Sequence, residues 1–174
     1  MKSQKIKNMT HIALFAVIMA ICAWICIPTA LPFTMQTFGL FLALDVLGGK
    51  KGCAAVLVYL LLGAVGMPVF SGGQGGVGIL LGATGGYLLG MMPGALVVWL
   101  LEKFCTCSWK KCISMVLGLV ACYTFGSLWY GFFYARQSSI WAAFLYCVLP
   151  FVIPDLLKIS LALLVGHRVK KTLR

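Results

Sequence analysis

The stretch LPFVIPDLLK, residues 149–158, places two charged side chains inside an apolar segment. Asp155 is one of only three acidic residues in the chain, and Lys158 follows at i+3. On a helix both side chains would share one face. Pro154 suits the first turn of a helix, which would put Asp155 near the positive end of the helix dipole. Because a charge at membrane depth costs on the order of 3 kcal/mol, we interpret the pair either as a buried structural ion pair or as part of a ligand cavity.

The composition is that of an integral membrane protein. The chain has 174 residues, of which 62% are hydrophobic and 10% are charged, and apolar segments recur along it. Its length predicts a single domain over residues 1-174. The net charge is +11, but the basic residues lie in short connectors and no nucleic-acid motif is present. The charge is therefore interpreted as a topology signal and not as a nucleic-acid surface.

The eight cysteines do not predict a disulfide framework or a strong metal site. Several lie within apolar segments, where a free thiol packs as a small hydrophobic group. Cys105, Cys107 and Cys112 lie together in a basic connector, but without a nearby histidine they make a weak zinc candidate. We expect free thiols, no metal and no cofactor.

The apolar segments predict an all-α membrane protein with six transmembrane helices. These span residues 11-27, 33-47, 52-65, 83-101, 112-134 and 154-166. Residues 140-149 are interpreted as an interfacial helix or as the start of a broken sixth helix. The first segment has the basic start of a signal peptide, but no clear cleavage site follows it, so we expect a retained helix. It contains Ala16-x-x-x-Ala20, a spacing that permits close helix packing.

The basic residues predict the orientation of the chain in the membrane. If the N-terminus is cytoplasmic and six helices cross, twelve of the fourteen basic residues lie on the cytoplasmic side, and Arg136 alone lies outside. This bias predicts that both termini are cytoplasmic. Residues 28–32, residues 66–78 and the start of the last helix would then meet on the external face.

The two remaining acidic residues lie near predicted cytoplasmic connectors. Asp45 is close to the end of the second predicted helix, and the turn that follows contains Lys50 and Lys51. We expect Asp45 to neutralise these two lysines at the membrane surface. Glu102 is expected to pair within its own connector.

The glycine-rich stretch GMPVFSGGQGGVG, residues 66–78, cannot face lipid as irregular backbone, because its amide groups would be unsatisfied there. Its formal match to a dinucleotide-binding fingerprint is attributed to chance, since no strand precedes it. A membrane-surface loop and a lid over a binding site both remain open. Tyr87 follows in a helix entrance, as an interfacial anchor or a ligand contact.

The charged pair suits a small polar ligand. An ionised Asp155 only accepts hydrogen bonds, whereas Lys158 only donates them. A molecule with N–H groups beside a carbonyl, such as a cyclic urea, would satisfy both side chains. The sequence shows no nucleophile–base pair and no nucleotide site, so a binding protein is expected and not an enzyme.

Four stretches taken together resemble the BioY family, the biotin-binding S-components of energy-coupling-factor (ECF) vitamin transporters. They are LPFTMQT at 31–37, YLLLGAVGMPVF at 59–70, GATGGYLLG at 82–90 and LPFVIPDLLK at 149–158. They come in the family's order and cover the chain nearly end to end. Ala83 stands where the family pattern has proline, and Ile153-Pro154 replaces its more usual Pro-Gly.

The resemblance implies a six-helix S-component in a bacterial or archaeal plasma membrane that captures biotin from outside. It implies that Asp155 and Lys158 hold the ureido ring while Tyr87 lies towards the carboxylate tail, although which of Lys158 and Tyr87 holds the carboxylate stays open. The implied lid residues are Gly72, Gly73, Gln74, Gly75 and Gly76.

The resemblance also implies partners. They are a transmembrane coupling protein, which would dock on Ala16 and Ala20, and two ATPase subunits that supply the energy. Two alternatives remain open. One is an S-component for a different vitamin, since a fold does not dictate its ligand. The other is a structural or assembly membrane protein in which Asp155 and Lys158 form an internal pair.

Overall fold

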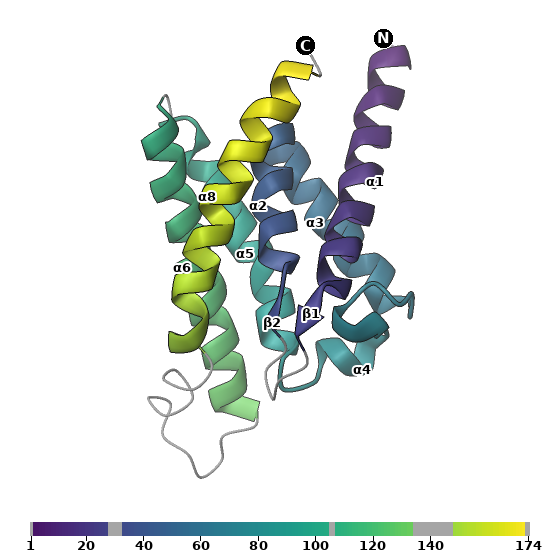
Figure 1. Ribbon diagram of the computed structural model, residues 1–174. Coiled ribbons are helices and arrows are strands. Elements are labelled where there is room, and N and C mark those ends of the chain that lie inside the picture. Colours follow the sequence, from purple (N-terminus) through teal and green to yellow (C-terminus); the bar gives the residue numbers. More distant parts are fainter. Residues whose placement is uncertain (1, 28–32, 105–106, 134–147, 173–174) are drawn as a thin grey trace.

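The computed structural model describes residues 2–27, 33–104, 107–133 and 148–172 (Figure 1). Its elements are α1 (Lys2–Trp24), β1 (Cys26–Ile27), β2 (Phe33–Thr34), α2 (Gln36–Leu47), α3 (Gly49–Ala64), the 3-10 helix η1 (Ser71–Gly73), α4 (Val77–Leu80), α5 (Gly85–Glu102), α6 (Ser108–Phe133) and α8 (Leu149–Thr172). The two short strands pair antiparallel. The predicted helical architecture is thus confirmed, with one short hairpin added to it.

Four of the described helices are long and apolar enough to cross a membrane, namely α1, α5, α6 and α8. The other two major helices are shorter, with 12 residues in α2 and 16 in α3. At 1.5 Å per residue they extend roughly 18 and 24 Å, less than the ~30 Å hydrocarbon core of a bilayer. The count of six spans therefore stays a prediction.

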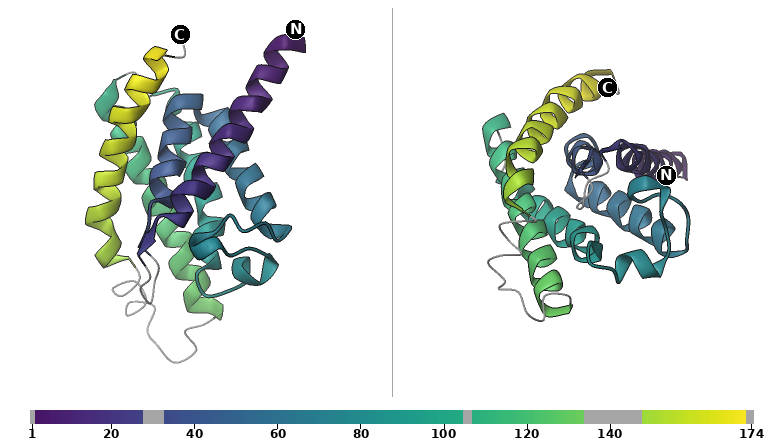
Figure 2. Two further views of the ribbon diagram at one scale, coloured as in Figure 1. Left: turned by 45° about the vertical axis from the view of Figure 1, so that its right-hand side comes forward. Right: turned by 60° about the horizontal axis from the view of Figure 1, so that its bottom comes forward.

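Helix α2 lies at the centre of the bundle. It packs against α8 on one side and against α1 and α3 on the other, while α5 pairs with α6 (Figure 2). Eight of its twelve residues are buried, as its apolar sequence requires. The two chain ends lie at one end of the bundle, whereas the β1–β2 hairpin and α4 lie at the other end (Figure 1).

Small residues allow α5 and α6 to pack closely. Gly90 and Gly94 are one turn apart on α5, and Gly118 is on α6. A Cβ atom at Gly94 would lie 2.7 Å from the Gly118 carbonyl oxygen, and one at Gly90 would lie 2.8 Å from that of Cys122. The spacing therefore sets how near the two backbones come, as in other membrane helix pairs.

The last helix begins earlier than the sequence analysis predicted. Helix α8 starts at Leu149 and not at Pro154, so Asp155 is its seventh residue. Pro150 occupies the first turn, where the missing N–H of proline is tolerated, and Pro154 lies inside the helix. The predicted place of Asp155 at the positive end of the helix dipole is therefore wrong. Its charge is balanced by side chains instead.

Two other predicted segments differ, and a third is mostly not described. The first helix begins at Lys2 and ends at Trp24, so it starts nine residues before the predicted 11-27 and gives way to strand β1. Part of the predicted irregular stretch is helical, as α4. The predicted interfacial segment 140-149 falls mainly outside the described residues.

The alanine pair of α1 faces the interior. Ala16 is 1% exposed and Ala20 is 8% exposed, and both belong to the main hydrophobic core. Side chains with so little exposure offer little surface to a partner in this conformation, and docking of a coupling protein on them stays a prediction. The small-residue spacing serves packing within the chain.

Candidate ligand-binding site

The charged pair is buried between helices at the end of the bundle that carries the hairpin. The Lys158 Nζ atom lies 2.7 Å from Asp155 Oδ1, and the side chains are 6% and 4% exposed. Burial of two unpaired charges would be strongly unfavourable. The ion pair therefore needs further polar partners to be stable there.

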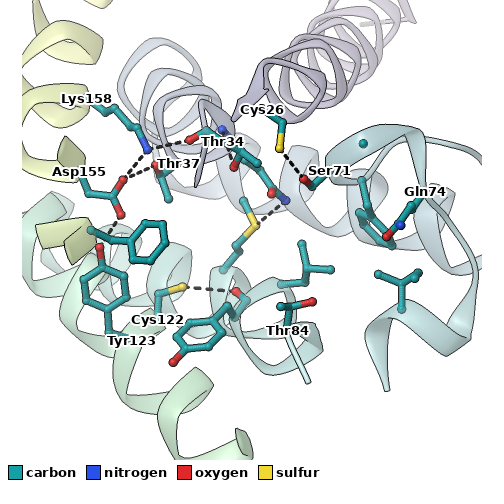
Figure 3. Close-up of a pocket in the computed structure, with 18 residues that line it drawn as sticks. Cys26, Thr34, Thr37, Ser71, Gln74, Thr84, Cys122, Tyr123, Asp155 and Lys158 are labelled. Atoms are coloured by element: carbon teal, nitrogen blue, oxygen red, sulfur yellow. Dashed lines mark hydrogen bonds and ion pairs between the residues drawn. The ribbon is translucent and has the colours of Figure 1, made fainter. Parts of the chain in front are cut away.

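Two other helices supply donors to the Asp155 carboxylate. The Thr37 hydroxyl of α2 donates to Oδ1 at 2.9 Å, and the Tyr123 hydroxyl of α6 donates to Oδ2 (Figure 3). Together with Lys158, these contacts join α2, α6 and α8 at one carboxylate. Each is charge-assisted and is stronger than a neutral hydrogen bond.

The β1–β2 hairpin supplies the remaining partners of Lys158. Its ammonium donates to the Thr34 backbone carbonyl at 2.6 Å and lies 4.2 Å from the centre of the Phe33 ring. Phe33 in turn stacks on Phe151, with ring centroids 5.9 Å apart. The hairpin register, with Cys26 opposite Thr34, holds this carbonyl in position. The lysine is thereby fixed by a charge, a carbonyl dipole and an aromatic face.

The pair opens on a cavity of about 490 Å³, within the size range of small-molecule sites. The polar and sulfur-bearing residues that line it are Cys26, Thr34, Gln36, Thr37, Ser71, Gln74, Thr84, Tyr87, Met91, Cys122, Tyr123, Asp155 and Lys158. Apolar walls come from Phe70, Ile79, Leu88 and Phe151. The cavity therefore combines an apolar body with one anion and one cation that already contact each other.

Tyr87 lines this cavity, as predicted from the sequence. Its hydroxyl lies 3.4 Å from the Ser127 hydroxyl. Its ring fits against Gly126, where a Cβ would overlap it. Tyr87 is therefore held from the α6 side of the cavity while its face remains part of the wall.

The glycine-rich loop contributes less of its length than expected. Gly72 and Gln74 line the cavity, but Gly73, Gly75 and Gly76 are not among its lining residues. Gly73 and Gly76 have φ values of 72° and 101°, which suit glycine, and Gly75 packs against the Met67 carbonyl. We therefore assign these three to the shape of the loop, and their contact with a ligand stays a prediction.

Thr37, Tyr123 and Gln36 line the cavity but are not predicted as site residues from the sequence. Thr37 and Gln36 lie in the 31–37 stretch that carries the resemblance. The sequence therefore indicated that this stretch matters, but not what these two residues do. Tyr123 is one aromatic residue among many in α6, and no local pattern distinguishes it. Only the packing of α6 against α8 brings it to Asp155.

Metal chemistry has little support among the residues that the structure describes. Within those ranges, no group of three His, Cys, Asp or Glu side chains gathers. Cys112 is a free thiol, and Cys105 lies outside the described residues.

This geometry defines a class of protein: a helical membrane protein that binds a small molecule carrying both hydrogen-bond donors and acceptors. A sequence model of the BioY family matches residues 1–174, and the chain belongs to that family. The resemblance stated from the four sequence stretches is thereby confirmed.

Two relatives match over nearly their whole length. The biotin transporter BioY of Thermotoga maritima is 40% identical over 168 residues, covering 95% of this chain and 96% of that protein. The probable biotin transporter BioY of Pyrococcus horikoshii is 33% identical over 167 residues, covering 95% and 98%. A crystal structure of the S-component for biotin from an ECF-type ABC transporter superposes with a TM-score of 0.88 at 25% identity, covering 98% and 94%.

Proposed function

We propose that this chain is the biotin-binding S-component of an ECF-type transporter and captures biotin in the cavity beside Asp155 and Lys158. The observation that carries the proposal is a buried, preorganised ion pair facing a cavity of about 490 Å³ in a chain of the BioY family. Relatives and the similar structure are named for biotin. The chain would bind and deliver the vitamin without covalent chemistry.

The hydrogen-bonding capacity of the pair suits a ureido ring, which has one N–H donor on each side of its carbonyl. The Lys158 ammonium has three N–H groups, and Asp155 and Thr34 accept two of them. The third can donate to the ureido carbonyl. A carboxylate offers about four acceptor positions, and Asp155 uses three of them for Lys158, Thr37 and Tyr123. One position remains for a ureido N–H.

The rest of the cavity suits the other parts of biotin. Leu88 and Ile79 offer apolar surface for the thiophane ring and the alkyl chain. Gln74 and Gly72 of the loop and Tyr87 of α5 line the cavity as well, and they are proposed to meet the carboxylate end. The carboxylate would then lie near the mouth, with the ureido ring at the deep end against α8.

The arrangement of basic residues supports the proposed orientation. Lys170 and Lys111 both contact Asp45, and Lys51 donates to Asn8, so the basic parts of α1, α3, α6 and α8 lie at one end of the bundle. By the positive-inside rule this end, with both termini, is cytoplasmic. The cavity then opens towards the outside of a bacterial or archaeal plasma membrane.

Transport would require partners. We propose a transmembrane coupling protein and two ATPase subunits, since the similar solved structure belongs to an ECF-type ABC transporter. Uptake of labelled biotin by cells that lack other biotin transporters, with and without such a module, tests this step. Uptake that does not depend on ATPase activity would contradict it.

A ligand panel tests the binding proposal. The purified, detergent-solubilised and ligand-free protein is titrated with biotin, thiamine and riboflavin by calorimetry. Heat and thermal stabilisation with biotin alone would support the proposal. Binding of thiamine or riboflavin would indicate an S-component for a different vitamin, and no response from any of the three would favour a structural membrane protein.

A further inference from the structure

One polar side chain in the cavity wall has a fixed orientation and a remaining acceptor. Gln36 is the first residue of α2 and is 7% exposed. Its Nε2 atom donates to the Tyr59 hydroxyl at 2.8 Å and to the Met91 sulfur at 3.4 Å. An amide nitrogen has two N–H groups, so these two contacts use both of them.

The partners of Tyr59 determine which way the Gln36 amide points. The Tyr59 hydroxyl donates its single hydrogen to the Val69 backbone carbonyl at 3.0 Å, and a carbonyl can only accept. The hydroxyl must therefore accept from Gln36, which requires nitrogen and not oxygen on that side. The Met91 sulfur, a weak acceptor, requires the same. The amide is thus held with its nitrogen towards α3 and α5.

Both described hydrogen bonds of the Gln36 side chain use its nitrogen. Among the described contacts, none involves its oxygen, Oε1. The residue lines the cavity and precedes Thr37, which donates to Asp155. The proposed ligand has two ureido N–H groups, which point in different directions, and Asp155 has one acceptor position left. The other N–H therefore needs a second acceptor.

We infer that the side-chain oxygen of Gln36 accepts the second ureido N–H, opposite the N–H bound by Asp155. This inference rests on the proposed biotin-binding function and extends it to a further specificity-determining residue. The ligand would then be recognised by two fixed acceptors and one fixed donor, Lys158. Molecules that present only one ring N–H would be rejected, because one buried acceptor would be left unpaired.

The test uses two carbamate analogues of biotin, in each of which one ring N–H is replaced by oxygen. They are titrated into the purified parent protein and into Gln36→Met, which keeps the length of the side chain but has no strong acceptor. In the parent, both analogues should bind at least about tenfold more weakly than biotin, since each leaves one acceptor without its donor. Gln36→Met should bind biotin about tenfold more weakly than the parent does.

The variant should also distinguish the two analogues. In Gln36→Met, the carbamate that lacks the N–H facing position 36 should bind about as tightly as biotin binds to the same variant. The other carbamate should still bind more weakly than biotin. A merely structural role would weaken all three ligands by one factor. Tyr59→Phe is the matched control, because it removes the same interhelical hydrogen bond but keeps the Gln36 oxygen, with the amide still oriented by the contact of Nε2 with the Met91 sulfur. Both analogues should therefore still bind more weakly than biotin to this variant.

Three outcomes would overturn the inference. They are unchanged biotin affinity in Gln36→Met, equal penalties for both carbamates in that variant, or a parent protein that binds one carbamate as tightly as biotin. The last measurement needs no variant, so it decides the matter even if Gln36→Met fails to fold. A parent that binds no biotin at all would instead contradict the proposed function.

Discussion

Two buried aspartates contact lysines of α8 at opposite ends of the bundle, and their surroundings differ. Asp155 pairs with Lys158 three residues along the same helix, and both side chains are at most 6% exposed. Asp45 on α2 contacts Lys170 of α8 at 2.6 Å and Lys111 of α6 at 3.7 Å, and these lysines are 32% and 40% exposed. The first pair opens on a cavity of about 490 Å³, the second on one of about 40 Å³.

These surroundings distinguish a proposed binding site from a structural contact. A pair within one helix joins no helices by itself, so Asp155 and Lys158 depend on donors and acceptors from α2, α6 and the hairpin, and they face space large enough for a ligand. The Asp45 contacts run between helices and hold α2, α6 and α8 together near the chain ends. A carboxylate beside lysines is therefore not enough to predict a site; the adjoining volume decides it.

The largest expected effect is on ligand binding at the hairpin end. Asp155→Asn keeps the shape of the side chain but loses charge-assisted acceptance, so biotin binding should weaken by roughly 1.5–3 kcal/mol. Calorimetric titration of the purified variant measures this. Parental affinity in a folded Asp155→Asn variant would remove the distinction between the two aspartates.

A substitution at the other end should act on stability. A Cβ atom at Gly166 of α8 would overlap the Asp45 carboxylate, so Gly166→Ala must displace it. Overpacking of this kind costs about 1–3 kcal/mol. Thermal unfolding in detergent should show a lower melting temperature, with the biotin dissociation constant of the folded protein unchanged. A weaker biotin affinity would mean that the two ends are coupled.

Removal of the Asp45 charge should have a smaller effect of the same kind. Asp45→Asn loses contacts to lysines that are about a third exposed, so solvent already screens them. We expect a loss of about 1 kcal/mol in unfolding free energy. The difference in unfolding free energy between Asp45→Asn and the parent should become smaller as salt is added. A difference that salt leaves unchanged would argue against an electrostatic origin.

A similarly small effect, on binding and not on stability, is expected from a residue that supports the site. Tyr123→Phe removes the donor to Asp155 Oδ2 and leaves Thr37 and Lys158 on Oδ1. Biotin binding should weaken by about 1 kcal/mol, because the carboxylate is held less firmly. Titration of this variant beside Asp155→Asn gives the order of the two effects. An equal or larger loss in Tyr123→Phe would make the tyrosine, and not the carboxylate, the principal contact.

The sequence predicted the site's charged centre because charges in an apolar chain are rare and conspicuous. Asp155 and Lys158 could be selected for that reason alone, and their shared helix face follows from the i+3 spacing. Tyr123 could not be selected, since an aromatic residue in an aromatic-rich helix carries no such signal. Its role depends on how α6 meets α8, which periodicity does not determine.

The partners of Asp45 show the same limit. Lys50 and Lys51 are its neighbours in sequence, yet the structure pairs it with Lys170, which is 125 residues away. Local spacing likewise favoured Pro154 as a helix start, whereas Pro150 occupies the first turn of α8. In both cases the sequence identified the kind of residue correctly, and tertiary packing determined its position.

The most direct test of the account is a biotin titration into three purified, ligand-free proteins: the parent, Asp155→Asn and Asp45→Asn. The account predicts tight binding by the parent, binding weakened by at least about tenfold in Asp155→Asn, and parental affinity in Asp45→Asn despite its lower stability. Absence of biotin binding by the folded parent, or equal weakening in both variants, would contradict the claim that the Asp155–Lys158 end alone is the binding site.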